Sequence, residues 1–124
     1  MKYAVAIALT MLSAAALAKA SQRTPVVCLH GADESADQKT RRQQALQLTR
    51  AINTAESMQS RSNGGKYPAL ADLSFSAGVP AGFEARLSTD GNGYAFSVKD
   101  TMDPCHFAFF SDQAGMIYNA TPIQ

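Results

Sequence analysis

Side chains suited to catalysis at neutral pH are scarce in this sequence. It has two histidines, two cysteines and no tryptophan among its 124 residues. Two histidines nearly exclude the enzyme classes that need a histidine cluster. The sequence also contains no Gly-x-Ser-x-Gly nucleophile elbow, no His-Glu-x-x-His pair and no phosphate-cradling glycine loop. We therefore expect a protein that is not an enzyme.

An apolar run of the length that spans a membrane is also missing. Residues 3–18 form an apolar stretch of about sixteen residues, whereas a membrane-spanning helix needs roughly twenty. Lys2 precedes this stretch, and Ala18-Lys19-Ala20 ends it with the small-x-small pattern of a signal peptidase site. The pattern predicts a signal peptide over 1–20, cleaved after Ala20, and a periplasmic or secreted protein. The alternative is an uncleaved membrane anchor; after cleavage we expect no stable membrane span.

A strong excess of charge of one sign is absent as well. Without Lys2 and Lys19, nine basic residues face ten acidic ones, so the mature chain has a net charge of about −1. This balance does not indicate a basic surface of the kind that binds nucleic acid, so we do not expect nucleic acid as a partner. A mature chain of about a hundred residues has the usual size of one domain. We predict an extended lead over 21–34 and a single domain over 35–124.

Residues 37–60 contain neither glycine nor proline and show helical periodicity. The stripe of apolar residues recurs at steps of three and four: Ala45, Leu48, Ile52 and Ala55, with Met58 or Gln59 next. This spacing predicts an amphipathic helix. Asp33 or Ser35 can cap its start, and Asn63-Gly64-Gly65 supplies a left-handed stop at its end.

The second half of the chain predicts strands. Residues 83–87 and 94–99 alternate between apolar and polar side chains around the turn 89–93, which is typical of a β-hairpin. A third strand is expected over 105–110 and a fourth over 116–118, joined by a turn at 111–115. We expect Phe107 and Phe109 in the core and Phe110 on the other face of the sheet.

A helix with one apolar stripe and a sheet with one apolar face must cover each other. The sequence therefore predicts an α+β fold, with one long N-terminal helix packed on a four-stranded antiparallel meander sheet.

This order of elements carries turn motifs that resemble the type IV pilin and type II secretion pseudopilin family, over about residues 41–122. The matching motifs are Gly65-Lys66-Tyr67-Pro68 after the helix, the leucine-containing loop 69–73, Asp90-Gly91-Asn92-Gly93-Tyr94 in the first hairpin and the final hairpin 110–118. The resemblance implies a pilin-like globular head over 35–124.

The chain departs from the family at its start. It has no prepilin leader and no Phe-Thr-Leu-Ile-Glu type start, so packing into a filament through an N-terminal helix is not expected. The resemblance then implies a non-enzymatic interaction module of an envelope or secretion system. Its expected partner is another envelope or secreted protein, and its oligomeric state stays open.

Two cysteines in an oxidising compartment favour a disulfide, here Cys28–Cys105. Closing a loop of about 77 residues is worth roughly 4.5 kcal/mol in the chain-entropy model. The alternatives are a zinc site, to which His30 and His106 would add two ligands, and a catalytic Cys–His pair.

A calcium site is a further alternative. Asp90, Asn92 and Asp112 lie in or beside expected turns and offer oxygen ligands, although Asp and Asn also serve turns through their own hydrogen bonds. Some pseudopilins carry calcium in a loop of this region, and the resemblance extends that option here. A periplasmic module that binds a metal or small ligand is thus the alternative function, while we expect no bound cofactor.

Three residues are candidates for contact with a protein partner. Arg41 and Arg42 form a small basic patch on the helix that could dock an acidic partner. The alternative is that they belong to an ordinary solvated helix face. Phe110 becomes a candidate if it is exposed.

Overall fold

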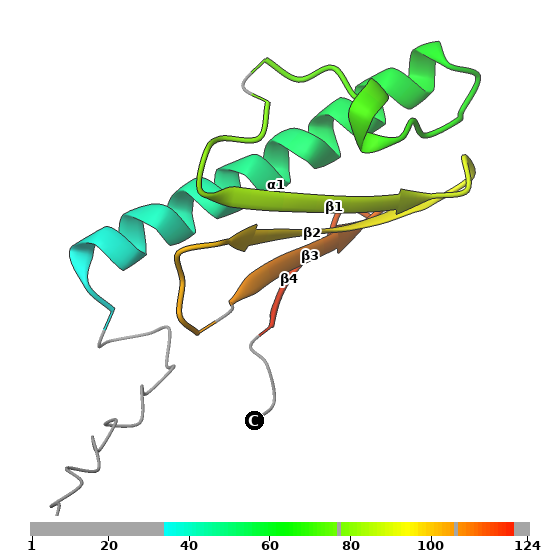
Figure 1. Ribbon diagram of the computed structural model, residues 1–124. Coiled ribbons are helices and arrows are strands. Elements are labelled where there is room, and N and C mark those ends of the chain that lie inside the picture. Colours follow the sequence, from blue (N-terminus) through cyan, green and yellow to red (C-terminus); the bar gives the residue numbers. More distant parts are fainter. Residues whose placement is uncertain (1–33, 77, 106, 121–124) are drawn as a thin grey trace, which may run out of the picture.

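A computed structural model describes residues 34–76, 78–105 and 107–120. The described elements are α1 (Ala36–Ser62), a short 3₁₀ helix η1 (Leu70–Asp72), β1 (Phe83–Thr89), β2 (Tyr94–Asp100), β3 (Ala108–Asp112) and β4 (Ile117–Ala120). α1 lies along one face of an antiparallel sheet (Figure 1). The expected α+β class with a four-stranded antiparallel sheet is confirmed. The predicted signal peptide and extended lead lie outside the described residues, except for Glu34.

Both ends of α1 follow from local sequence. Ser35 accepts a hydrogen bond from the backbone N–H of Gln38, and the Gln38 side chain accepts one from the backbone N–H of Ser35. This capping box satisfies two backbone donors that a helix start leaves free. After Ser62, Gly64 and Gly65 have φ angles of 62° and 81°, which a glycine adopts without steric cost. The helix is thus slightly longer at both ends than expected.

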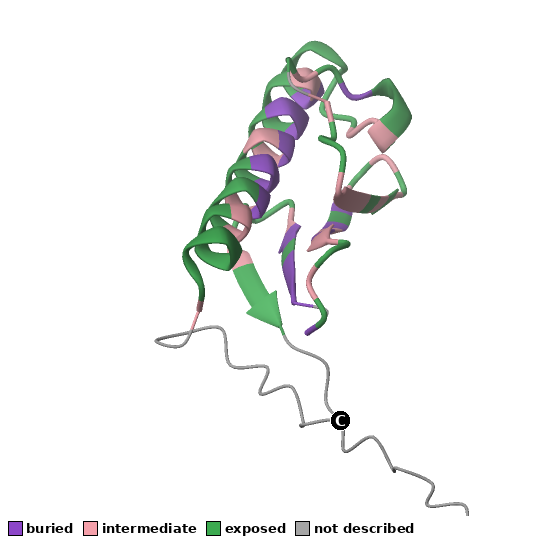
Figure 2. Cartoon of the chain, turned by 60° about the vertical axis from the view of Figure 1, so that its left-hand side comes forward, coloured by how far each residue is buried: buried purple, intermediate pink, exposed green. Residues whose placement is uncertain are grey.

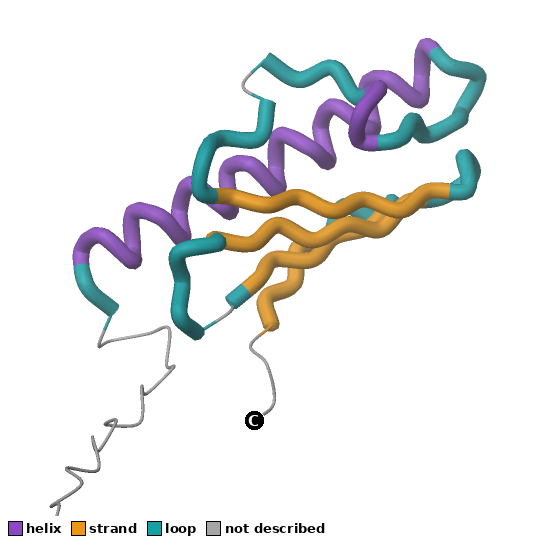
Figure 3. The backbone as a smooth tube through the Cα atoms, in the orientation of Figure 1, coloured by secondary structure: helices purple, strands orange, loops and turns teal. Residues whose placement is uncertain are grey.

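The four strands form a meander in the order β1-β2-β3-β4 (Figure 3). The register places Leu87 opposite Phe96, Val98 opposite Phe109 and Phe110 opposite Tyr118. Because side chains alternate along a strand, Phe96, Val98 and Phe109 share the face toward α1. Phe110 and Tyr118 lie on the opposite face, which we call the outer face. The predicted hairpin and the predicted split of the phenylalanines are confirmed.

The core lies between α1 and the sheet. The predicted stripe of Ala45, Leu48, Ile52 and Ala55 is buried, as the purple segments of α1 facing the strands show (Figure 2). Of the two residues expected to continue it, Met58 is wrong, because that side chain is 66% exposed, whereas Gln59 is half-buried. At 100° per residue, Glu56 and Ser60 follow Ile52 on the same side of the helix, whereas Met58 points away. The inner face therefore ends in polar residues.

The third and fourth strands start later than predicted. Asp103 accepts hydrogen bonds from the backbone N–H groups of Cys105 and Phe107, at 2.9 and 3.2 Å. These bonds form a turn where we expected strand, so β3 begins at Ala108. Its other end extends to Asp112, and β4 runs to Ala120 instead of ending at Tyr118.

Candidate functional site

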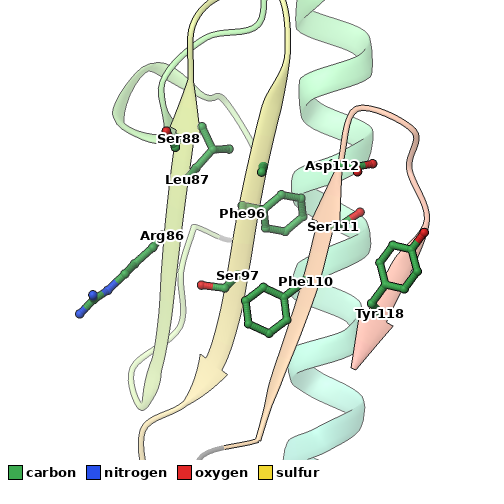
Figure 4. A pocket seen from close by; sticks show the side chains of 10 residues that line it. Arg86, Leu87, Ser88, Phe96, Ser97, Phe110, Ser111, Asp112 and Tyr118 are labelled. Carbon is green, nitrogen blue, oxygen red and sulfur yellow. The ribbon is translucent and has the colours of Figure 1, made fainter. Parts of the chain in front are cut away.

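The outer face of the sheet carries a shallow groove with a volume of about 450 Å³. Figure 4 shows it with α1 behind the sheet. Residues from all four strands line it: Arg86, Leu87, Ser88, Ala95, Phe96, Ser97, Phe110, Ser111, Asp112 and Tyr118. The surface of the groove is mainly apolar, and its charged groups are Arg86 of β1 and Asp112 of β3.

Two aromatic side chains dominate the β3–β4 side of this groove. Phe110 and Tyr118 face each other across the two strands, yet they are 44% and 52% exposed. Met116 is also exposed, and the Tyr118 hydroxyl donates to its sulfur at 3.7 Å. Phe110 was expected on this face. Tyr118 was not singled out, although the spacing of the final hairpin already makes it a cross-strand neighbour of Phe110.

The packing of the core explains why Phe110 lies on the outer face of the sheet. Phe107 and Phe109 are buried and pack edge to face, with ring centroids 4.9 Å apart. Since Phe109 points toward α1, the strand alternation turns Phe110 to the outer face. Burial of Phe109 thereby sets the exposure of its neighbour.

Within the described residues, the sheet ends in two edge strands, β1 and β4. β4 pairs with β3 on one side, and no other described strand pairs with its second side. The four residues of β4 carry no charge, and Tyr118, Asn119 and Ala120 are exposed. An uncharged edge strand offers its backbone N–H and C=O groups to another chain. The opposite edge strand, β1, differs because it carries the charged residues Glu84 and Arg86 and contacts η1.

The arginines of the predicted basic patch form ion pairs within the chain. Arg41 pairs with Asp100, and its guanidinium lies 4.9 Å from the centre of the Phe83 ring. Arg42 pairs with Glu34 through two hydrogen bonds of 2.8 and 2.9 Å. These contacts hold α1 to neighbouring segments. They make Phe110 the stronger of the predicted contact candidates.

The predicted calcium ligands serve the turns that contain them. Asp90 accepts hydrogen bonds from the backbone N–H groups of Asn92 and Gly93 at 2.8 and 2.9 Å. These two bonds are the main causes that lower the pKa of the Asp90 carboxyl. Asp112 accepts from the N–H of Ala114 in the other hairpin. Within 34–76, 78–105 and 107–120, no group of three or more Asp, Glu, His or Cys side chains converges on a metal position.

Cys105 is buried in the turn before β3 and is not a free thiol. Its expected partner Cys28, together with His30 and His106, lies outside the described residues. The Cys28–Cys105 disulfide and the alternative zinc site both stay predictions.

Sequence reasoning missed a chain of polar side chains inside the molecule. The Tyr94 hydroxyl donates to Oδ1 of Asn53 at 2.8 Å, and Nδ2 of Asn53 donates to the Ser111 hydroxyl at 2.7 Å. Ser111 donates in turn to the backbone carbonyl of Met116 at 2.7 Å. The chain links α1, β2 and β3 to the turn before β4. Glu56, one helical turn after Asn53, is buried beside it.

No helix among the described residues has the length and apolar character to cross a membrane. Comparison with known proteins adds no relative: no family model, no curated protein and no solved structure matches this chain.

Proposed function

We propose that this chain is an exported, non-enzymatic interaction domain of pilin-like type that binds an extended segment of another envelope or secreted protein. The observation that carries the proposal is the exposed pair Phe110–Tyr118 beside the uncharged free edge of β4. Exposed aromatic side chains are typical of protein-binding surfaces.

The edge and the groove favour one binding mode. An extended segment can add a strand to β4, so that main-chain hydrogen bonds supply affinity. Every second side chain of that segment would then reach the outer face beside Tyr118. The apolar lining near Phe110 favours aliphatic or aromatic side chains at those positions. β4 has four residues, so the paired stretch is short and the groove must add to its affinity.

Two features support the pilin-like and exported parts of the proposal. The helix precedes a four-stranded meander, which agrees with the order expected for a pilin-like head. The apolar stretch and the Ala18-Lys19-Ala20 pattern support export.

Photo-crosslinking in the native cell tests this proposal. A photoreactive phenylalanine analogue replaces Tyr118 in the full-length chain, and a matched control carries it at Met58, which is also exposed but lies on α1. We expect a discrete protein adduct from position 118 that is absent from position 58. Identical adducts from both positions, or none from position 118, would contradict the proposal.

A further inference from the structure

Glu56 is the one acidic side chain on the face of α1 that packs against the sheet. It is 0% exposed, and neither of its carboxyl oxygens has a hydrogen-bond partner. An ionised carboxylate at this position would lose its hydration without gaining a hydrogen bond in its place. Burial costs much less free energy for the neutral acid than for the anion.

The groups that face Glu56 do not compensate a negative charge. Tyr94 of β2 carries a phenol beside it, and Tyr67, from the segment after α1, packs against Tyr94 at 4.9 Å between ring centroids. Asp112 lies on the outer face of β3, and its negative charge acts on Tyr94. Asn53, one turn before Glu56 on α1, is occupied by Tyr94 and Ser111, and Ser60, one turn after it, donates to the backbone carbonyl of Ser57.

This burial shifts the pKa of both Glu56 and Tyr94. Burial alone raises the pKa of Glu56 to about 7, and no described lysine or arginine contributes to that shift. Burial, and after it the charges of Glu56, Tyr67 and Asp112, raise the pKa of Tyr94 to about 12. Tyr94 therefore remains a neutral hydrogen-bond donor to Asn53 throughout the range in which Glu56 titrates.

We propose that Glu56 is a pH-sensitive joint between α1 and the sheet: it is a neutral acid in the folded protein under mildly acidic conditions, and its ionisation loosens the contact of α1 with β2 and β3. The polar chain through Asn53 and Ser111 ties the same part of α1 to the β3–β4 hairpin.

The sign of the effect follows from proton linkage. The pKa of Glu56 is about 7 in the folded chain and 4.5 as the ordinary value. Between these values the folded state binds more protons than the unfolded state, so stability decreases as pH rises. The stabilisation is complete below 4.5 and is lost once the pH has risen through about 7.

Urea unfolding of the mature, oxidised chain between pH 5 and 8 tests the proposal. The comparison is wild type against Glu56→Gln, which keeps the shape and removes the charge, with Asp72→Asn as an exposed control. Relative to Glu56→Gln, the unfolding constant of the wild type should rise on the order of 50- to 100-fold from pH 5 to pH 8. Asp72→Asn should follow the wild-type profile.

An unchanged ratio between wild type and Glu56→Gln across this pH range would overturn the proposal. If Glu56→Gln does not fold, carbon NMR of the wild type decides instead. The mature chain has three glutamates, Glu34, Glu56 and Glu84. We expect the carboxyl carbon of Glu56 to titrate with a midpoint near 7, as its burial predicts. Titration of all three below pH 5 would overturn the proposal.

Discussion

Arg41 on α1 and Asp100 at the end of β2 form a two-point ion pair, with Nε 2.7 Å from Oδ2 and Nη2 2.5 Å from Oδ1. The two residues are 59 positions apart in the sequence. Nη2 also donates to the backbone carbonyl of Gly82 at 3.1 Å. Planar, bidentate pairs of this kind are the strongest class of side-chain hydrogen bonds. The pair therefore fixes the first half of α1 against the hairpin of β1 and β2.

Replacing this arginine should destabilise the fold without changing its shape. Arg41→Met keeps an unbranched side chain but removes the guanidinium, which lies over the Phe83 ring and donates to the Asp100 carboxylate and the Gly82 carbonyl. We expect a lower urea midpoint at neutral pH, measured by circular dichroism. Arg50→Met, on an exposed part of α1, is the control and should leave the midpoint nearly unchanged.

The same pair predicts an acid limb in the stability profile. The hydrogen bonds from Arg41 hold the pKa of Asp100 below its ordinary value of 3.8. The stabilisation is therefore present above pH 3.8 and is lost as the pH falls through the lower pKa of the folded state. Asp100→Asn should weaken this limb to the part that Asp90, whose pKa is also lowered, contributes, while the separate loss of stability toward pH 7 is kept. An acid limb as steep in Asp100→Asn as in the wild type would assign it to another carboxyl.

The helix–sheet core should respond strongly to truncation at its centre. Ile52 is completely buried against the inner face of the sheet. Ile52→Ala should cost about 2–5 kcal/mol of unfolding free energy, because it removes buried methyl groups and leaves a cavity. Met58→Ala, on the exposed side of α1, should change stability by less than about 0.5 kcal/mol. Equal effects at both positions would contradict the packing described for α1.

The buried polar chain depends on its central amide. Asn53→Ala removes the acceptor of the Tyr94 hydroxyl and the donor to Ser111. Leaving buried polar groups unpaired costs about 1–3 kcal/mol, so the variant should unfold at correspondingly lower urea concentration. Ser111→Ala breaks one end of the chain and should cost less. The reverse order would mean that the chain is not centred on Asn53.

The outer-face aromatics should separate binding from folding. Phe110→Ser and Tyr118→Ser each remove one half of an exposed cross-strand pair, which is worth about 0.2–1 kcal/mol. Stability should therefore fall only slightly, whereas affinity for the partner should fall at least about tenfold if either ring is a binding hot spot. Thermal unfolding and titration of the partner segment measure the two effects. A stable variant with unchanged affinity would remove the ring from the interface.

Local signals in the sequence were enough for much of the fold. Ser35 and Gly64–Gly65 mark the ends of α1, and the alternation around Asp90–Tyr94 predicts the first hairpin with its inward residues. The start of β3 was misplaced because the Asp103 side chain takes backbone N–H groups that a strand would use. Turn chemistry of this kind competes with strand pairing and leaves no periodic signal.

The candidate sites were harder to predict. A carboxylate on an amphipathic helix is normally assigned to the solvent, and only the packing reveals that Glu56 points inward. Likewise, Arg41 and Arg42 look like a free basic patch until their acidic partners come close in space. Phe110 could be assigned to the outer face in advance, because strand alternation fixes it once Phe109 is in the core.

The segment recovered by crosslinking from position 118 allows the most direct test of the binding account. That segment, synthesised as a peptide, is added to the full mature chain, and amide hydrogen–deuterium exchange is followed along the sequence. We predict slower exchange in β4, Ile117–Ala120, with little change in α1. Slower exchange on α1 with β4 unchanged would contradict strand addition at the outer face.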